Sequence, residues 1–150
     1  MIEIYTDGSC TPTNPGPGGW AVIINNPEDP ISLCGSESWT TNNRMELTAM
    51  IEAICWCLDA DVDDVVIYSD SKYVVDGYND WMHKWVKKKW NKRGGIKNKD
   101  LWKLLYKCYQ DFGGKVKWVA GHSGVEGNES ADLLADSAAR DQISEGEIGG

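Results

Sequence analysis

The feature that most constrains the fold is a pair of short apolar segments, residues 2–6 and 65–69, each followed directly by an aspartate. The chain between them includes a helical pattern, and a strand, a long crossover and a second strand usually pair in parallel. We therefore expect two neighbouring parallel strands that place Asp7 and Asp70 at the same edge of a sheet. Ordinary strand spacing would put the two aspartates roughly 5 Å apart.

The remaining periodicity predicts one α/β domain. Strands over residues 20–25 and 31–39 follow the first strand through short connections, which favour an antiparallel meander. Residues 41–43 offer helix N-caps, and the helix after them has a buried face formed by Leu47, Met50, Ile51, Ile54 and Leu58. Later elements are helices over 71–90, interrupted near 77–78, and over 99–112, a strand over 116–119 and a closing helix over 128–140.

The length of 150 residues suits a single domain with one sizeable core. We place that domain at residues 1–141, because residues 142–150 are polar and glycine-rich and predict a flexible tail. No apolar stretch approaches the roughly 20 residues that cross a bilayer, and the first residues do not resemble a secretion signal. Five irregularly spaced cysteines predict neither a disulfide framework nor a zinc site, and favour a reduced, intracellular protein.

The charge is distributed unevenly. The net charge is −8, which argues against nucleic-acid binding when the chain is averaged as a whole. More than half of the basic residues nevertheless fall in one short segment: Lys84, Lys87, Lys88, Lys89, Lys92, Arg93, Lys97 and Lys99. Such a run is often only a solvated face, but tryptophans are interleaved with these lysines, and Trp81 and Trp85 share one helical face.

Four acidic residues are candidate metal ligands, and each also has a purely structural interpretation. Asp7, in the stretch IYTDGS, could belong to a turn, Glu46 could close a capping box with Asn43, and Asp132 could favour the start of the last helix. Asp7 and Asp70 would repel each other if they lay side by side. A hard divalent cation such as Mg²⁺ would remove that repulsion, because it prefers oxygen ligands.

The order and surroundings of these acids decide between the interpretations. The motifs TDGSC, NPGPGGW, TTNNRMEL, YSDSKYV, GHSG and NESADLLA, in this order and spacing, closely resemble type 1 ribonuclease H over nearly the whole chain. The resemblance implies a mixed five-stranded sheet, with three antiparallel and two parallel strands, flanked by helices. It also implies that Asp7, Glu46, Asp70 and Asp132 are catalytic and bind two Mg²⁺ ions with substrate, or Mn²⁺ in their place.

The implied reaction is hydrolysis of the RNA strand of an RNA–DNA hybrid, leaving 5′-phosphate and 3′-hydroxyl ends, by a two-metal-ion mechanism. His122, in the loop AGHSG, matches the family histidine that is thought to assist proton movement or product departure, although a lone loop histidine is often incidental. The expected catalytic residues are therefore Asp7, Glu46, Asp70, His122 and Asp132.

The resemblance also implies how the hybrid is held. Asn14, Asn42 and Asn43 match family positions that contact the RNA, Thr41 and Asn98 match a pocket for a DNA phosphate, and Tyr73 and Trp81 match the DNA-strand groove. The basic segment matches a protrusion that helps to hold the hybrid in many bacterial-type members. Its expected substrate-binding residues are Lys84, Trp85, Lys87, Lys88, Lys89 and Trp90.

Two positions depart from the family pattern. Lys72 stands where glutamine is expected, so it is predicted to bind substrate through an ionic contact in place of a neutral one. Trp39 stands near the phosphate pocket where arginine is common.

Three other functions fit parts of the pattern: a related integrase or Holliday-junction resolvase, a non-catalytic hybrid-binding module, and a domain of a reverse transcriptase. TTNNRMEL and NPGPGG favour ribonuclease H over the first, and the presence of all four acids argues against the second. We expect a cytoplasmic monomer that has no membrane association.

Overall fold

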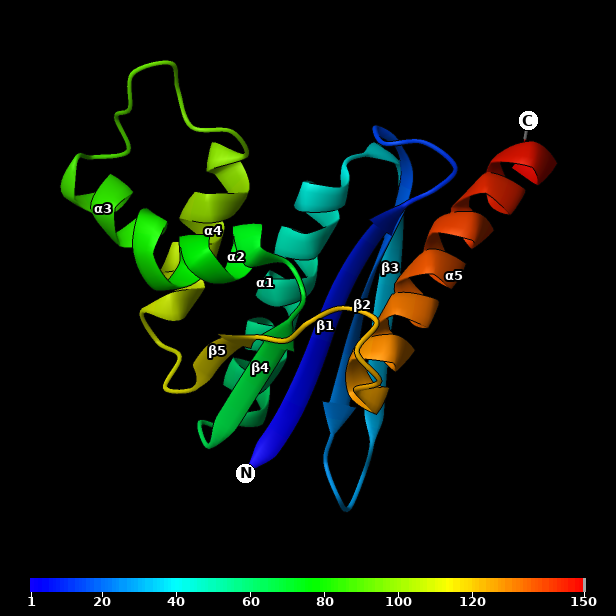
Figure 1. The fold of residues 1–150 in the computed structure, drawn as a ribbon, viewed down its shortest axis with the longest axis horizontal. Helices are drawn as coiled ribbons and strands as arrows, with labels where there is room; N and C mark the ends of the chain where they lie inside the picture. The colour runs from blue at the N-terminus through cyan, green and yellow to red at the C-terminus, as the bar shows by residue number, and fades with distance from the viewer. Residues whose placement is uncertain (150) are drawn as a thin grey trace.

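The computed structural model describes residues 1–149, with side chains as far as residue 142. Its centre is a five-stranded sheet with the order β3-β2-β1-β4-β5 (Figure 1). The strands are β1 (Ile2–Cys10), β2 (Gly16–Asn25), β3 (Ile31–Thr40), β4 (Val65–Ser69) and β5 (Lys115–Trp118). The β1–β2 and β2–β3 pairs are antiparallel, whereas β1–β4 and β4–β5 are parallel. This arrangement confirms the predicted fold class.

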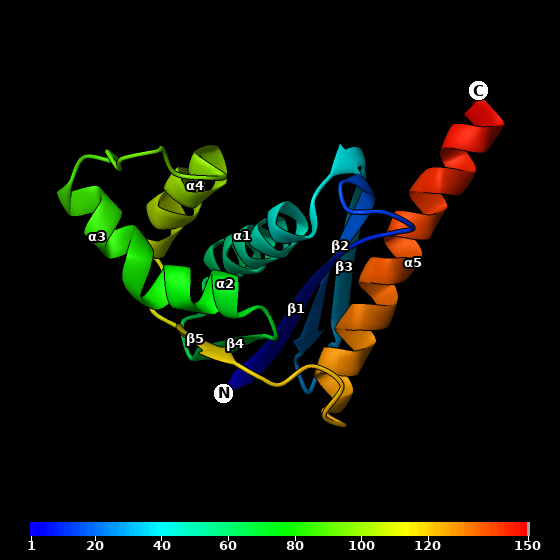
Figure 2. The same ribbon diagram turned by 45° about the horizontal axis from the view of Figure 1, so that its top comes forward.

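Helices cover both faces of the sheet. Helix α1 (Asn42–Ala60) lies on one face and α5 (Glu126–Gly149) on the other, as Figure 2 shows. Beside α1 lie α2 (Lys72–Asp76), a π-helical turn η1 (Gly77–Trp81), α3 (Met82–Lys87) and α4 (Lys99–Tyr109). The main core lies between α1, α4 and the sheet and includes fully buried Ile4, Leu47, Ile54 and Trp102. No helix of residues 1–149 is both long and apolar enough to cross a membrane.

The first strand is longer than predicted. We expected β1 to end at residue 6 and IYTDGS to form a turn, but the strand continues through Asp7 to Cys10. The reason is its antiparallel partner, because Asp7 pairs with Ala21 and Cys10 with Gly18. The ladder hydrogen bonds outweigh the local turn preference of Asp, Gly and Ser. Strand β2 likewise begins at Gly16, within the segment predicted to be a connection.

The last helix is also longer than predicted. Helix α5 begins at Glu126 and continues to Gly149, so the helix end predicted at residue 140 is wrong. The hydroxyl of Ser36 on β3 donates to Oε1 of Gln142 at 2.9 Å, which links the helix to the sheet beyond that point. The division of the chain at residue 141 stays a prediction, and Gly150 lies outside the described residues.

The helical stretch after β4 is interrupted, as predicted, near residues 77–78. The interruption is the π-helical turn η1, an insertion of the kind that often marks functional sites. It lies where the chain approaches Trp102 closely. A Cβ on Gly77 would stand 2.0 Å from the Trp102 ring, so only glycine allows this packing.

Candidate active site

Asp7 lies near the middle of the sheet edge where β1 continues beyond β4. Asp7 is only 4% exposed. The parallel pairing of β1 with β4 ends at Thr6 and Ser69, so Asp7 and Asp70 are the next residues on neighbouring strands. This placement is the one that the parallel-strand argument predicts, although Asp7 lies in a strand and not in a turn.

Glu46 reaches the same place from the first turns of α1 and is 7% exposed. Its Oε1 accepts from the backbone N–H of Gly8 at 2.9 Å, and its Oε2 accepts from the Ser69 hydroxyl at 3.4 Å. The N-cap of α1 is Thr41, whose side chain accepts from the Arg44 N–H, so the capping-box interpretation of Glu46 is wrong. A Cβ on Gly8 would stand 2.3 Å from the Glu46 nitrogen, which shows how closely helix and strand approach.

Asp70 is held by neighbours from two other elements. Its Oδ2 accepts from the side-chain amide of Asn128 on α5 at 3.2 Å. Its backbone carbonyl accepts from the indole N–H of Trp118 at the end of β5, at 3.1 Å. Asp70 therefore has both its carboxylate and its main chain fixed.

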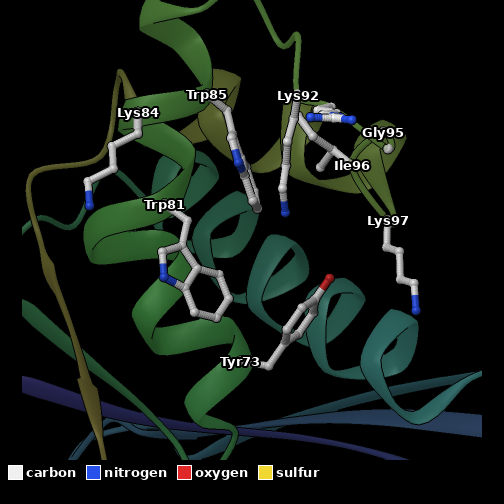
Figure 3. Close-up of a pocket in the computed structure, with 10 residues that line it drawn as sticks. Tyr73, Trp81, Lys84, Trp85, Lys92, Gly95, Ile96 and Lys97 are labelled. Atoms are coloured by element: carbon white, nitrogen blue, oxygen red, sulfur yellow. The ribbon is translucent and has the colours of Figure 1, made fainter.

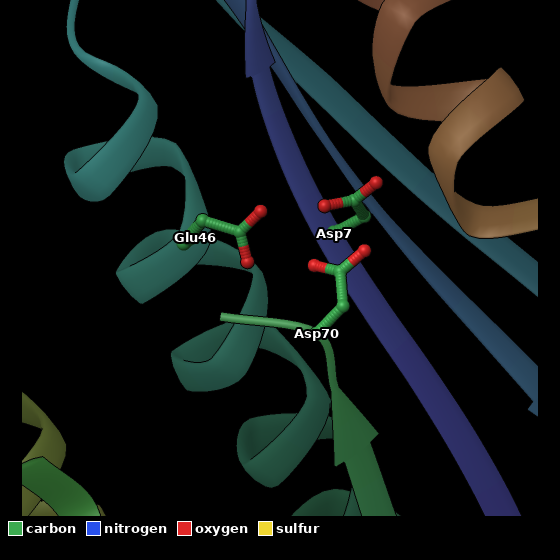
Figure 4. A group of neighbouring side chains, drawn as sticks. All are labelled: Asp7, Glu46 and Asp70. Carbon is green, nitrogen blue, oxygen red and sulfur yellow. The ribbon is translucent and has the colours of Figure 1, made fainter. Parts of the chain in front are cut away.

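These three carboxylates converge, as Figure 4 shows. Asp7, Glu46 and Asp70 each offer an oxygen, and the three oxygens lie within 4.8 Å of one another. The pKa of Asp7 is raised to about 7, chiefly by burial, with further contributions from the charge of Asp70 and a hydrogen bond with Asp132. The pKa of Glu46 is raised well above its ordinary range by burial, a hydrogen bond with Asp7 and the two neighbouring charges.

The raised pKa values mean that the site resists carrying its full negative charge, and a divalent cation would relieve this. An all-carboxylate donor set fits a hard cation such as Mg²⁺ or Mn²⁺ and does not suit a soft metal. Asp132 does not belong to the group of three, but it is half-buried on α5, and its side chain contributes to the raised pKa of Asp7. It is thus a neighbour of the converging group.

His122 lies apart from this buried group, in the exposed turn between β5 and α5. Its backbone has a left-handed φ of 55°. The turn is closed by the Ser123 hydroxyl, which donates to the Ala120 carbonyl at 2.6 Å. The imidazole is therefore presented to solvent on a short turn that follows directly on the strand beside Asp70.

The asparagines predicted to contact RNA lie at the N-terminus of α1 and in the β1–β2 connection. The Asn42 side chain accepts from the Cys10 N–H at 2.7 Å, and the Asn42 N–H donates to the Asn14 side chain at 3.1 Å. Asn14, Asn42 and Asn43 are all exposed. The structure thus brings Asn14 and Asn42 together, with Asn43 following them on the first turn of the helix.

A hydrogen-bonded network joins α1 to α2 and α4 beside the predicted phosphate pocket. Arg44 forms a bidentate pair with Asp100, with an Nη2–Oδ2 distance of 2.8 Å, and also donates to Asn98 at 3.3 Å. Asn98 and Trp102 both donate to the Tyr73 hydroxyl, at 3.1 and 3.0 Å. The network fixes Asn98 and Tyr73 relative to α1.

The basic segment surrounds a pocket of about 520 Å³ (Figure 3). Tyr73, Trp81 and Trp85 form its aromatic wall, with ring centroids 5.9 Å and 6.3 Å apart along the series. The remaining lining residues are Lys84, Lys92, Arg93, Gly94, Gly95, Ile96 and Lys97. Of these cations Lys84 pairs with Asp80 at 3.1 Å. A groove that combines aromatic rings with cationic side chains suits a nucleic-acid backbone.

Not all predicted contacts of the basic segment line this pocket. Lys87, Lys88 and Lys89 are exposed at and just after the end of α3, and none of them is a lining residue. Trp90 is half-buried and its ring centroid lies 6.2 Å from that of Trp85. These residues therefore extend the cationic surface beyond the pocket.

Sequence reasoning missed three residues that organise the site: Arg44, Trp118 and Asn128. Arg44 lies within TTNNRMEL and Asn128 begins NESADLLA, so both were inside recognised motifs without an assigned role. Asn128 is 2% exposed, and burial of a polar side chain is the signal that marks it as paired. Trp118 had no signal in the sequence beyond its place at the end of a strand.

Comparisons with known proteins match nearly the whole chain to ribonuclease H proteins. A family model described as RNase H matches residues 1–140. The chain is 44% identical over 146 residues to a ribonuclease H of Hahella chejuensis, which covers 96% of this chain and 97% of the relative. It is 43% identical over 136 residues to ribonuclease HI of Rickettsia prowazekii, covering 89% and 88%. LC9-RNase H1, described as a type 1 RNase H with the type 2 active-site motif, superposes with a TM-score of 0.83 at 34% identity, covering 94% of this chain and 72% of that chain.

Proposed function

The chain belongs to the ribonuclease H family of nucleases, and from that premise we propose that it hydrolyses the RNA strand of RNA–DNA hybrids. The products are a 5′-phosphate and a 3′-hydroxyl. The observation that carries this proposal is the convergence of Asp7, Glu46 and Asp70 from three separate elements. A scaffold that only bound hybrids would have no reason to bury acids whose charges destabilise one another.

Asp7, Glu46, Asp70 and Asp132 are the residues that would hold the metal, two Mg²⁺ ions with substrate or Mn²⁺ in their place. When bound, divalent cations activate a water for attack and stabilise the departing 3′ oxygen. The chain's own contribution is to fix the ligands beforehand. The Gly8 N–H orients Glu46, and the Asn128 amide orients Asp70, so little rearrangement is needed at the moment of reaction.

His122 acts as a mobile proton carrier in this proposal. It stands on an exposed turn outside the buried acids, where it can reach solvent as well as the nucleic acid. A histidine suits the task because its ordinary pKa lies near neutrality. Its loss should slow the reaction and leave the carboxylate chemistry intact.

The hybrid is distinguished by polar groups on the RNA side and by a fixed pocket on the DNA side. Asn14, Asn42 and Asn43 can donate to and accept from 2′-hydroxyl groups. Thr41 and Asn98 hold a DNA phosphate, and the Arg44 network keeps them in place. The residues that hold the DNA groove and the backbone beyond it are Tyr73, Trp81, Lys84, Trp85, Lys87, Lys88, Lys89 and Trp90, with Lys72 nearer the acids.

The test is a substrate panel with and without Mg²⁺. End-labelled hybrid, duplex RNA and duplex DNA are incubated with the protein and the products separated by length. We expect loss of the RNA strand of the hybrid alone, and only with metal. Cleavage of branched DNA in preference to hybrid would favour a resolvase, and metal-independent binding without cleavage would favour a binding module.

We further propose that the protein works as a cytoplasmic monomer and that residues 1–141 form the catalytic domain. The supporting observation is that all five cysteines are free thiols, as expected in a reducing compartment. Size-exclusion chromatography with light scattering tests the first point. A chain ending at residue 141 should retain hybrid cleavage if the second is right.

A further inference from the structure

Trp118 makes two polar interactions although it is 45% exposed. It pairs with Ser69 at the end of the β4–β5 ladder, directly beside the chain that carries Asp70. The edge of its indole donates to the Asp70 carbonyl at 3.1 Å. The face of the same ring lies 4.8 Å from the Lys72 ammonium, measured to the ring centroid.

The hydrogen bond from the Trp118 indole to the Asp70 carbonyl lies just beyond the last backbone pair of β4 and β5. β4 ends at Ser69, so the Asp70 carbonyl has left the strand and takes its partner from a side chain. Asn128 on α5 separately holds the carboxylate of Asp70. The Trp118 N–H therefore helps to decide where the carboxylate points, because it fixes the backbone from which the carboxylate projects.

The ring face does something different for Lys72. Among the described residues, Lys72 forms no ion pair with a carboxylate, so its charge is not cancelled. An aromatic face attracts an ammonium weakly and leaves it able to exchange partners, whereas a carboxylate would compete with phosphate for it. The ring thus restrains a free cation two residues from Asp70.

We propose that Trp118 is a positioning residue that joins the two tasks: its N–H orients Asp70, and its face holds Lys72 ready for a backbone phosphate of the bound strand. The inference rests on the proposed function, because it assumes a nucleic acid beside the acids. It adds a residue to which neither the sequence motifs nor the comparisons assign a role.

Two substitutions separate the tasks. Trp118→Phe keeps a ring face and removes the N–H, and Lys72→Gln removes the ammonium. We expect Trp118→Phe to weaken Mg²⁺ binding to the substrate-free protein, measured by calorimetry, and to lower kcat, each by about 2- to 10-fold, the usual worth of one hydrogen bond. Lys72→Gln should leave that Mg²⁺ affinity unchanged. It should reduce the salt slope of hybrid binding, measured by fluorescence anisotropy in EDTA, by about 1.

Lys115→Gln is the matched control, because Lys115 is an exposed lysine at the other end of β5. Lys115→Gln should match the wild type in Mg²⁺ affinity, kcat and salt slope. All three variants should have the melting temperature of the wild type. Wild-type Mg²⁺ affinity and kcat in Trp118→Phe, or a wild-type salt slope in Lys72→Gln, would overturn the inference. Failure of the wild type to cut hybrid would instead overturn the proposed function, so the two failures are distinguishable.

Discussion

Asp7 and Glu46 are almost fully buried at the sheet edge, whereas the lysines from Lys84 to Lys89 stand in solvent around α3. The acidic site is built from β1, α1 and the end of β4, with each carboxylate held by a neighbour. In the basic segment several cationic side chains surround a few aromatic rings, so no single cation is expected to be essential. The first region should tolerate no change in its ligands, and the second should respond gradually.

The largest effect is expected at the acidic site. Asp70→Asn should lower hybrid cleavage by at least about 10³-fold, because an amide keeps the shape but removes the charge that a cation needs. Hybrid binding, measured by anisotropy, should largely survive. Asp76→Asn, an exposed acid on α2, is the control and should cleave normally. Substantial activity in Asp70→Asn would count against the metal-site assignment.

His122 should fall between the two regions, because its proposed role is in the chemistry but it lies on an exposed turn. His122→Ala should lower kcat by about 10²-fold, as expected for loss of one acid–base group, with little change in hybrid affinity. Ser123→Ala removes the hydroxyl that closes the same turn and so separates loop geometry from the imidazole. Equal losses in both variants would assign the effect to the loop.

The basic segment should show a graded and salt-dependent response. Replacing Lys87, Lys88 and Lys89 together by Gln should weaken hybrid binding on the order of 10-fold at low salt and flatten its salt dependence by up to about 3 in slope. kcat at saturating substrate should change little. The matched control replaces Lys103, Lys107 and Lys115, which are exposed elsewhere. An unchanged slope in the first triple variant would refute a role for these lysines in binding.

The smallest effect concerns stability in the absence of metal. The pKa of Asp7 is about 7 in the folded protein, above its ordinary 3.8, so the folded state holds this proton more tightly than the unfolded state does. The resulting stabilisation is complete below pH 3.8 and is lost as the pH rises through 7. Because Asp7 and Glu46 interact and therefore titrate as a pair, we expect a loss of about 1–2 kcal/mol.

Thermal unfolding in EDTA can measure this loss. The contribution of Asp7 should lower the melting temperature by about 3–6 °C between pH 5 and pH 8. Mg²⁺ should restore stability at pH 8, and Asp7→Asn should show a smaller decline without metal. Asp76→Asn should retain the wild-type decline. If Asp7→Asn lost as much thermal stability between pH 5 and pH 8 as the wild type, the raised pKa of Asp7 would not be the cause of that loss.

Sequence patterns predicted the fold where local and tertiary preferences agree. The buried face of α1 and the parallel pairing of β1 with β4 follow from spacing alone, and both are present, although Leu58 at the end of that face is only half-buried. The prediction failed at Asp7, where pairing with the next strand, β2, overrides the turn preference of IYTDGS. The sequence left the role of Glu46 ambiguous, because a capping box and a metal ligand have the same local pattern. Only the hydrogen bond from the Gly8 N–H on β1 distinguishes them.

The candidate site shows the same division. The four acids could be named because they lie in recognisable motifs, but their surroundings come from segments far apart in the chain. Trp118 meets Asp70 across 48 residues and Asn128 meets it across 58. Such partners carry no local signal, because each is an ordinary strand or helix residue in its own neighbourhood.

The π-helical turn Gly77–Trp81 has a consequence for the aromatic wall that no aromatic residue reveals. A wider turn accommodates one extra residue, and each residue of an α-helix rotates the next by about 100°. Removing a single residue within α3 itself, between Trp81 and Trp85, would carry Trp85 about 100° around the helix axis and off the wall. Removing Asn79 or Asp80 would instead convert the wide turn into a regular α-helical turn and leave the direction of Trp85 unchanged. The π-helical turn is thus the place in this helical stretch where a change of length disturbs the aromatic wall least.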